Sequence, residues 1–198
     1  MTLIKIIEII ALVAGVPYMV LEVLQKNGMW YFGIFTSTAC AIQFGLEHNW
    51  ANMGLNIYYV AMAFWGLYKW GQDSRKMKKE ATAGGKVIHL RHLGLRKGLL
   101  SLLLFAVGGT ALFLVLKATG AQNPFFDAFS TALCVVAMIW LAESVPYHWV
   151  LWIIGDIFLV IMCYMEQKYL MTALYATYVA ASSYGLFHWF RSGQYIDD

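Results

Sequence analysis

Seven long apolar stretches dominate this chain and limit its possible folds more than any other feature. A helix of about 20 apolar residues crosses the hydrocarbon core of a bilayer, and its backbone groups must hydrogen-bond within the helix there. Polar residues and prolines, including residues 26–28 and Pro146, separate the stretches. The predicted spans are residues 3–24, 30–46, 53–68, 98–118, 125–142, 149–165 and 170–190. The sequence therefore predicts an all-α, multi-pass membrane protein with seven transmembrane helices.

The composition supports lipid as the main solvent of the folded chain. Only 13% of the residues are charged and 61% are hydrophobic, whereas soluble domains carry about 25% charged residues. The net charge of +3 gives no reason to expect nucleic acid, because the basic residues gather in one loop. The cysteines Cys40, Cys134 and Cys163 lie in apolar stretches without C-x-x-C spacing, so neither disulfides nor a metal cofactor is expected.

Two distant stretches resemble each other in sequence. When the chain is shifted by 119 residues, Tyr59 aligns with Tyr178 and Leu67 with Leu186, and the same shift aligns further pairs of identical residues. These pairs include Trp30 with Trp149, Gly66 with Gly185, and Trp70 with Trp189. Chance supplies such matches easily in a chain rich in Trp, Tyr and Gly. Internal duplication is nevertheless typical of transporters, and it is the reading that we adopt.

Seven helices fit a duplicated three-helix unit with one added helix. Three spans end on the opposite side of the membrane from where they begin, so one inserted helix restores the direction of the second copy. We therefore expect a 3+1+3 arrangement with two parallel three-helix repeats and a binding site between them near the membrane midplane. The predicted parts are residues 1–70 (first repeat), 71–97 (basic cytoplasmic loop), 98–119 (linker helix) and 120–198 (second repeat).

Basic residues indicate the orientation of the chain in the membrane. The segment that follows the third span holds nine of the fourteen basic residues: Lys69, Arg75, Lys76, Lys78, Lys79, Lys86, Arg91, Arg96 and Lys97. Cytoplasmic loops carry such an excess, which places this segment inside, the N-terminus outside and the C-terminus inside. The same segment has the charge to bind anionic lipid, in addition to determining topology.

The sixth span holds the strongest candidates for a binding site. Trp149 and Trp152 are three residues apart and lie on one helical face, and Asp156 extends that face by one turn. A carboxylate inside a span is costly and is therefore a functional candidate. Two indoles beside a carboxylate form a receptor for a flat cationic ring, through stacking and cation–π attraction. The alternatives are an interfacial belt for Trp149 and a helix-packing network for Asp156.

The third and seventh spans repeat the three-residue spacing with polar and aromatic side chains. Asn56 and Tyr59 share one face of the third span, while Tyr175 and Tyr178 share one face of the seventh. Amide and phenol groups can hydrogen-bond a sugar or an amide, and they can equally hold helices together. The candidate substrate-binding residues are therefore Trp149, Trp152, Asn56, Tyr59, Asp156 and Tyr175.

At these residues the chain resembles the PnuC family of vitamin transporters, which are relatives of the SWEET sugar transporters. NIYYVAMAFWGLYKW resembles the end of that family's third helix, and FFDAFSTAL the start of its fifth. HWVLWIIGD and LMTALYATYVAASSYGLFHW resemble its W-x-x-W sixth helix and its last helix. The pattern departs at Trp65-Gly66-Leu67, where Tyr-Gly-Trp is expected, and in the loop before the third helix.

The resemblance implies uptake of nicotinamide riboside across a bacterial inner membrane by facilitated diffusion with alternating access. A cytoplasmic kinase would trap the substrate by phosphorylation without binding the transporter stably. Trp149 and Trp152 match the pair proposed to sandwich the ring, and Asn56 and Tyr59 match polar positions of the third helix. Membrane lipid is an expected partner, and a homo-oligomer is compatible with the sequence.

Three alternatives to this function follow from the same residues. Thiamine also presents a cationic aromatic ring, so the pairing of indoles with a carboxylate does not separate it from nicotinamide riboside. A membrane-complex subunit without a site of its own would show scattered polar residues rather than spaced ones. An intramembrane enzyme would need a nucleophile–base or metal cluster in the spans, and the sequence offers none, so no enzyme activity is expected.

Overall fold

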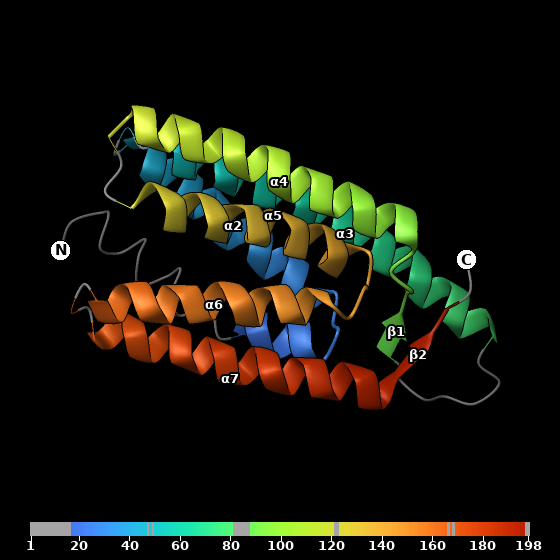
Figure 1. Ribbon diagram of the computed structural model, residues 1–198. Coiled ribbons are helices and arrows are strands. Elements are labelled where there is room, and N and C mark those ends of the chain that lie inside the picture. The colour runs from blue at the N-terminus through green and yellow to red at the C-terminus, as the bar shows by residue number, and fades with distance from the viewer. Residues whose placement is uncertain are drawn as a thin grey trace. The chain divides into compact units, whose positions relative to one another are not determined.

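Figure 1 shows the computed structural model, which describes residues 17–46, 48, 50–80, 88–120, 123–165, 167 and 169–196. Residues 17–23 are helical and belong to the first predicted span, whose earlier part lies outside the described residues. The helices that follow are α2 (Gly28–Leu46), α3 (Trp50–Glu80), α4 (Leu95–Ala118), α5 (Pro124–Ala142), α6 (His148–Met165) and α7 (Tyr169–Ser192). The prediction of an all-α chain with seven helices is confirmed.

Three of the described helices have both the length and the hydropathy of a membrane span. They are α4, α5 and α6, with mean hydropathy of 2.5, 1.9 and 1.8 over their most apolar segments. Two short strands, β1 (Ile88–Leu90) and β2 (Gly193–Tyr195), pair as a small sheet outside these helices. Leu90 accepts a hydrogen bond from the backbone of Ile196 at 2.9 Å, and the imidazole of His92 stacks on Tyr195 at 3.9 Å.

Helix α3 corrects the predicted boundary of the third span. Hydropathy ends that span at residue 68 and treats residues 71–97 as loop, but α3 continues without a break to Glu80. The continuation is rich in Lys, Met, Gln and Glu, which are good helix formers, and a helix that leaves the membrane needs no apolar residues. Helix α4 also begins at Leu95, three residues before the predicted span. Lys86 of the basic segment lies outside the described residues.

The chain forms two compact units, each built around one closely packed pair of helices. The first unit contains residues 1–89 with residues 142–144, and α2 packs along α3 within it. The second unit contains residues 90–141 and 145–198, and α6 packs along α7 within it (Figure 1).

The turn that leads into α2 has the same hydrogen bonds as the turn that leads into α6. In the first turn the amide of Lys26 donates to the carbonyl of Leu21, and in the second the amide of Val145 donates to that of Trp140, both at 2.8 Å. Such a bond closes a helix whose last residue is left-handed. Gln25 and Ser144 occupy that position, with φ of 44° and 59°. All of these residues correspond at the shift of 119.

The next turn of each unit repeats in the same way. Helix α2 ends at Leu46 and α6 at Met165, while α3 begins at Trp50 and α7 at Tyr169. Between them, His48 and Gln167 both adopt φ of 58°. Positive φ is uncommon for residues other than glycine. The four non-glycine residues with positive φ among those described therefore form two pairs at one spacing, which supports a duplicated structural unit.

A tryptophan packed on a glycine holds each helix pair together. A Cβ atom at Gly66 of α3 would lie 2.2 Å from the ring of Trp30, and one at Gly185 of α7 would lie 2.7 Å from the ring of Trp149. Each ring also meets a second tryptophan edge-on. The centroids of Trp30 and Trp70 are 5.0 Å apart, and those of Trp149 and Trp189 are 5.7 Å apart. All four indoles are fully buried.

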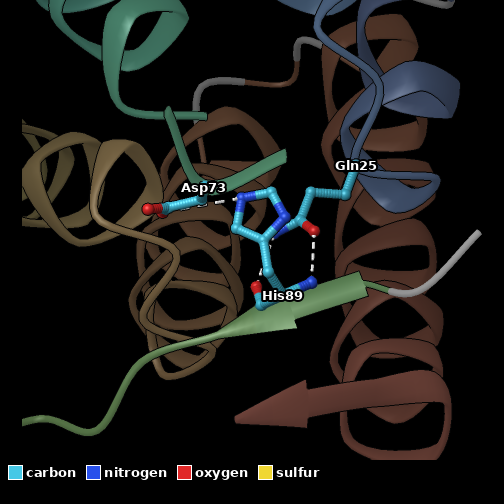
Figure 2. Close-up of polar contacts among 3 residues, drawn as sticks. All are labelled: Gln25, Asp73 and His89. Atoms are coloured by element: carbon cyan, nitrogen blue, oxygen red, sulfur yellow. Dashed lines mark hydrogen bonds and ion pairs between the residues drawn. The ribbon is translucent and has the colours of Figure 1, made fainter. Parts of the chain in front are cut away.

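In the first unit, strand β1 is held by the side chain of Gln25 (Figure 2). The Gln25 amide donates to the carbonyl of His89 at 2.8 Å, and the His89 amide donates to the Gln25 Oε1 at 2.7 Å. The His89 imidazole lies 3.8 Å from the carboxylate of Asp73 and edge-on to Trp70. Asp73 and His89 are both buried, so this cluster connects strand β1 to helix α3.

Candidate substrate site on helices α6 and α7

The site begins at Trp152, whose indole N–H is available to a ligand. The Trp152 side chain is half-buried, and its Nε1 is buried without a hydrogen-bond partner among the described residues. A buried donor without a partner costs about 1–3 kcal/mol. A substrate carbonyl or hydroxyl placed at this point would remove that cost.

One turn farther along α6, Gly155 leaves room beside Trp152. Gly155 is buried, yet no described atom lies within 4 Å of the position that a Cβ would occupy. Residues 152, 155 and 156 share one face of the helix. A side chain larger than hydrogen would therefore meet no other described side chain at its Cβ on this face of α6.

Asp156 provides a negative charge next to the phenols of α7. Tyr175 and Tyr178 are both close enough to Asp156 to interact electrostatically with it. All three side chains are half-buried, and the two tyrosine rings meet at a centroid distance of 6.1 Å. The structure therefore places Asp156 near Tyr175 across two helices that pack along each other, and Trp152 lies one turn before Asp156 on α6. It adds Tyr178, which the sequence had indicated only through its spacing from Tyr175.

Trp149 occupies a different environment from Trp152. Its indole is fully buried, with the ring on Gly185, its edge toward Trp189 and the imidazole of His148 at 4.7 Å. His148 is itself held by an Nδ1 contact of 2.8 Å with the carbonyl of Val145. This packing leaves no face of the Trp149 ring exposed.

Asn56 and Tyr59 lie on α3 in the first unit, where both are half-buried and interact with other groups. The Tyr59 ring is tilted against that of Tyr58 at 5.7 Å. At the shift of 119, Asn56 corresponds to Tyr175 and Tyr59 to Tyr178. The candidate residues of α3 and α7 are thus the same positions of the two repeated units.

These observations define a class of protein. Long apolar helices, a repeated helical unit, and a carboxylate with aromatic groups inside a span are features of a multi-pass membrane transporter. A family profile described as nicotinamide mononucleotide transporter matches residues 5–191. The chain belongs to that family, which confirms the resemblance that the sequence indicated.

Known relatives agree with this assignment. The nicotinamide riboside transporter PnuC of Escherichia coli K12 is 23% identical over an alignment 213 residues long, which covers 95% of this chain and 86% of that protein. The protein of the same name from Shigella flexneri matches to the same extent. A crystal structure of the vitamin B3 transporter PnuC has the same fold, with a TM-score of 0.67 and 21% identity over 92% of this chain and 79% of that one.

Proposed function

We propose that the protein carries nicotinamide riboside across a bacterial inner membrane by facilitated diffusion with alternating access. In this proposal a cytoplasmic kinase phosphorylates the substrate and so prevents its return, without a stable complex. The basic segment, residues 69–97, would face the cytoplasm, which places the N-terminus outside. Family membership and the names of the relatives support the substrate class.

The observation that carries the proposal is the group formed by Trp152, Gly155 and Asp156. The nicotinamide ring of the riboside is flat and cationic, so it can stack on an indole and be attracted by both the ring face and the carboxylate. The space at Gly155 would admit the ring, and the indole N–H of Trp152 would meet a carbonyl or hydroxyl of the substrate.

The charges of these helices favour the riboside over the mononucleotide. Helices α5 and α6 contain no Lys or Arg, and α7 carries only Arg191, in its last turn. A phosphate group would therefore approach Asp156 without a neighbouring cation on these helices, and like charges repel. The riboside has a positive ring and no phosphate, which matches the carboxylate of Asp156.

The other candidate residues have supporting roles in this proposal. Tyr175 and Tyr178 would hydrogen-bond the ribose or orient Asp156, while Asn56 and Tyr59 would act from the corresponding positions of α3. Trp149, buried against Gly185, would hold α6 on α7 and so determine where Trp152 lies.

Calorimetric titration of the purified protein with nicotinamide riboside, nicotinamide mononucleotide and thiamine tests the proposal. We expect binding of the riboside alone. Trp152→Ala should weaken it about 30-fold, since a desolvated cation–π contact contributes about 2 kcal/mol. Trp65→Ala, at an exposed tryptophan of α3, should bind like the wild type. Binding of thiamine alone would contradict the substrate, and unchanged binding by Trp152→Ala would contradict the site.

The transport mechanism needs a separate measurement. In vesicles that contain the purified protein, labelled riboside should enter without any ion gradient until its inside and outside concentrations are equal. Unlabelled riboside loaded inside should accelerate entry by exchange, as alternating access requires. Accumulation driven by an imposed pH gradient would contradict facilitated diffusion and would make Asp156 the first residue to examine.

A further inference from the structure

Strand β1 is held from two sides by parts of the chain that are distant in sequence. On one side, the side-chain amide of Gln25 bonds to both the carbonyl and the amide of His89, at 2.8 and 2.7 Å. On the other side, the amide of Ile196 donates to the carbonyl of Leu90 at 2.9 Å. Two neighbouring residues of β1 are therefore fixed by the turn before α2 and by the segment that contains β2.

The division of the chain into two compact units falls at the same place. His89 belongs to the first unit and Leu90 to the second. Strand β1 follows α3, the last helix of the first repeat, and precedes α4. It is thus the point at which the chain passes from one unit to the other, and each unit holds one of the two adjacent residues.

In the first unit, the contacts of β1 reach the tryptophans that hold the helix pair together. The His89 imidazole lies 3.8 Å from Asp73 and edge-on to Trp70, with ring centroids 5.8 Å apart (Figure 2). Trp70 in turn meets Trp30, whose ring packs on Gly66. All of these side chains are buried, so β1 cannot shift on α3 without displacing closely packed groups.

In the second unit, β1 reaches the equivalent tryptophan. The Leu90 side chain is buried and covers Gly193, where a Cβ atom would lie 2.6 Å from that side chain and closer still to the carbonyl oxygen of Trp189. Trp189 corresponds to Trp70 at the shift of 119, and it meets Trp149 edge-on. Adjacent residues of β1 are thus connected to equivalent positions of the two helix pairs.

We propose that β1 couples the two repeated units, so that a change in the packing of one helix pair is transmitted to the other through residues 88–90. Consecutive Cα atoms are held about 3.8 Å apart, so neither anchor can shift far without moving the other. The inference rests on the proposed function where it concerns transport, because in duplicated transporters the repeats move against each other during alternating access.

Hydrogen exchange of the full-length protein in detergent tests the coupling without any substrate. Gln25→Ala removes the first anchor, and we expect the Ile196 amide to exchange about tenfold faster, equivalent to about 1.4 kcal/mol. Gly193→Ala disturbs the second anchor, since its methyl group would meet Leu90. The His89 amide should then exchange faster by a similar factor, because a coupling free energy is reciprocal.

Each variant has a matched control. Lys26 lies in the same turn as the first anchor and has an exposed side chain, and a Cβ at Gly94, shortly after β1, meets no described atom within 4 Å. Lys26→Ala and Gly94→Ala should leave the exchange of both amides unchanged. If Gly193→Ala does not fold, Tyr195→Ala loosens β2 instead by removing the ring that stacks on His92 at 3.9 Å.

Exchange of labelled riboside across vesicles tests what the coupling does for transport. Gln25→Ala and Gly193→Ala should each slow this exchange about fivefold and leave riboside affinity unchanged, because neither residue belongs to the proposed site. The double variant should be no slower than the slower single variant. The two anchors act in series, so that the loss of one already interrupts the connection.

Either of two results would overturn the proposal. Exchange of the Ile196 amide that Gln25→Ala does not change would show that the two anchors are independent. Effects on riboside exchange that multiply in the double variant would give Gln25 and Gly193 separate structural roles. If the wild type exchanges no riboside, the proposed function fails, and the hydrogen-exchange result still decides whether β1 couples the units.

Discussion

The two repeated units agree in the residues that hold their helices together and differ one turn farther along. Trp30 on Gly66 and Trp149 on Gly185 are equivalent contacts, and the turns before α2 and α6 share their hydrogen bonds. The position that holds Trp152 in α6 holds Gly33 in α2, and the position of Asp156 holds Ser37. The shared residues therefore support the fold, while the differing residues include the proposed substrate-binding residues of the second unit.

The space around these positions differs as well. A Cβ at Gly33 would lie 3.2 Å from the ring of Tyr18, so the first helix fills the region beside α2. At Gly155 of α6 no described atom is within 4 Å. In the first unit the Tyr18 ring lies against Gly33, at the position that Trp152 itself occupies in α6, whereas the open position at Gly155 corresponds to Thr36 of α2. Two helical units can share their packing contacts and still differ in the side chains beside them.

The largest effect is expected where the two units agree. Gly66→Ala and Gly185→Ala each place a methyl group inside a buried indole, and overpacking of this kind costs about 1–3 kcal/mol. Both variants should lose thermal stability in detergent by similar amounts. Gly54→Ala on α3, where a Cβ meets no described atom, is the control and should be neutral or slightly stabilising. A loss of thermal stability in only one of the two variants would show that the two tryptophan–glycine contacts are not equivalent.

The next effect tests a difference between equivalent turn residues. Gln25 and Ser144 share a left-handed backbone, but only Gln25 reaches a strand, through two hydrogen bonds to His89. Gln25→Ala should cost about 2 kcal/mol, since each bond contributes about 1 kcal/mol. It should also increase hydrogen exchange at residues 88–90. Ser144→Ala should change little, because the Ser144 hydroxyl has no partner among the described residues. Equal losses of stability in the two variants would show that the conformation of the turn, rather than the hydrogen bonds of the Gln25 side chain, stabilises the protein.

Asp156→Asn tests the charge that distinguishes the second unit. The variant keeps the size of the side chain but removes the attraction for a cationic ring, and we expect affinity for nicotinamide riboside to fall about tenfold, equivalent to about 1.4 kcal/mol. Ser37→Asn, at the equivalent position of α2, serves as the control and should bind normally. Unchanged affinity in Asp156→Asn would assign that carboxylate to helix packing instead.

The smallest expected effect tests whether the space at Gly155 is open to substrate. Gly155→Ala adds one methyl group where no described atom would clash, so thermal stability should change by less than about 0.5 kcal/mol. The methyl group would enter the proposed ring position, and riboside affinity should fall a few-fold by titration. A clear loss of stability with normal affinity would mean that the space at Gly155 is closed in the membrane.

The helices were predictable because one physical length governs them. Bilayer thickness requires about 20 apolar residues, and seven apolar stretches near that length are visible in the chain, although among the described helices only α4, α5 and α6 reach the hydropathy of a span. Hydropathy did not predict the end of α3, because a helix outside the membrane needs no apolar residues. Helix α3 runs to Glu80 because its polar residues still favour helix in water. The pairs Trp30–Trp149 and Gly66–Gly185 were also visible in the sequence, although their contact was not, since sequence similarity does not say which side chains touch.

For the candidate site, the sequence alone determined which residue types share a helical face: two indoles and a carboxylate on α6, with phenols at the same spacing on α7. Only the tertiary structure decided how the two indoles differ. Trp149 is buried because Gly185, distant in the chain, has no side chain to keep the ring away. Trp152 is only half-buried and lies one turn before Gly155, although the indole N–H groups of both tryptophans have no partner among the described residues. Helical periodicity assigns a residue to a face, but burial and hydrogen bonding depend on neighbours that only folding brings together.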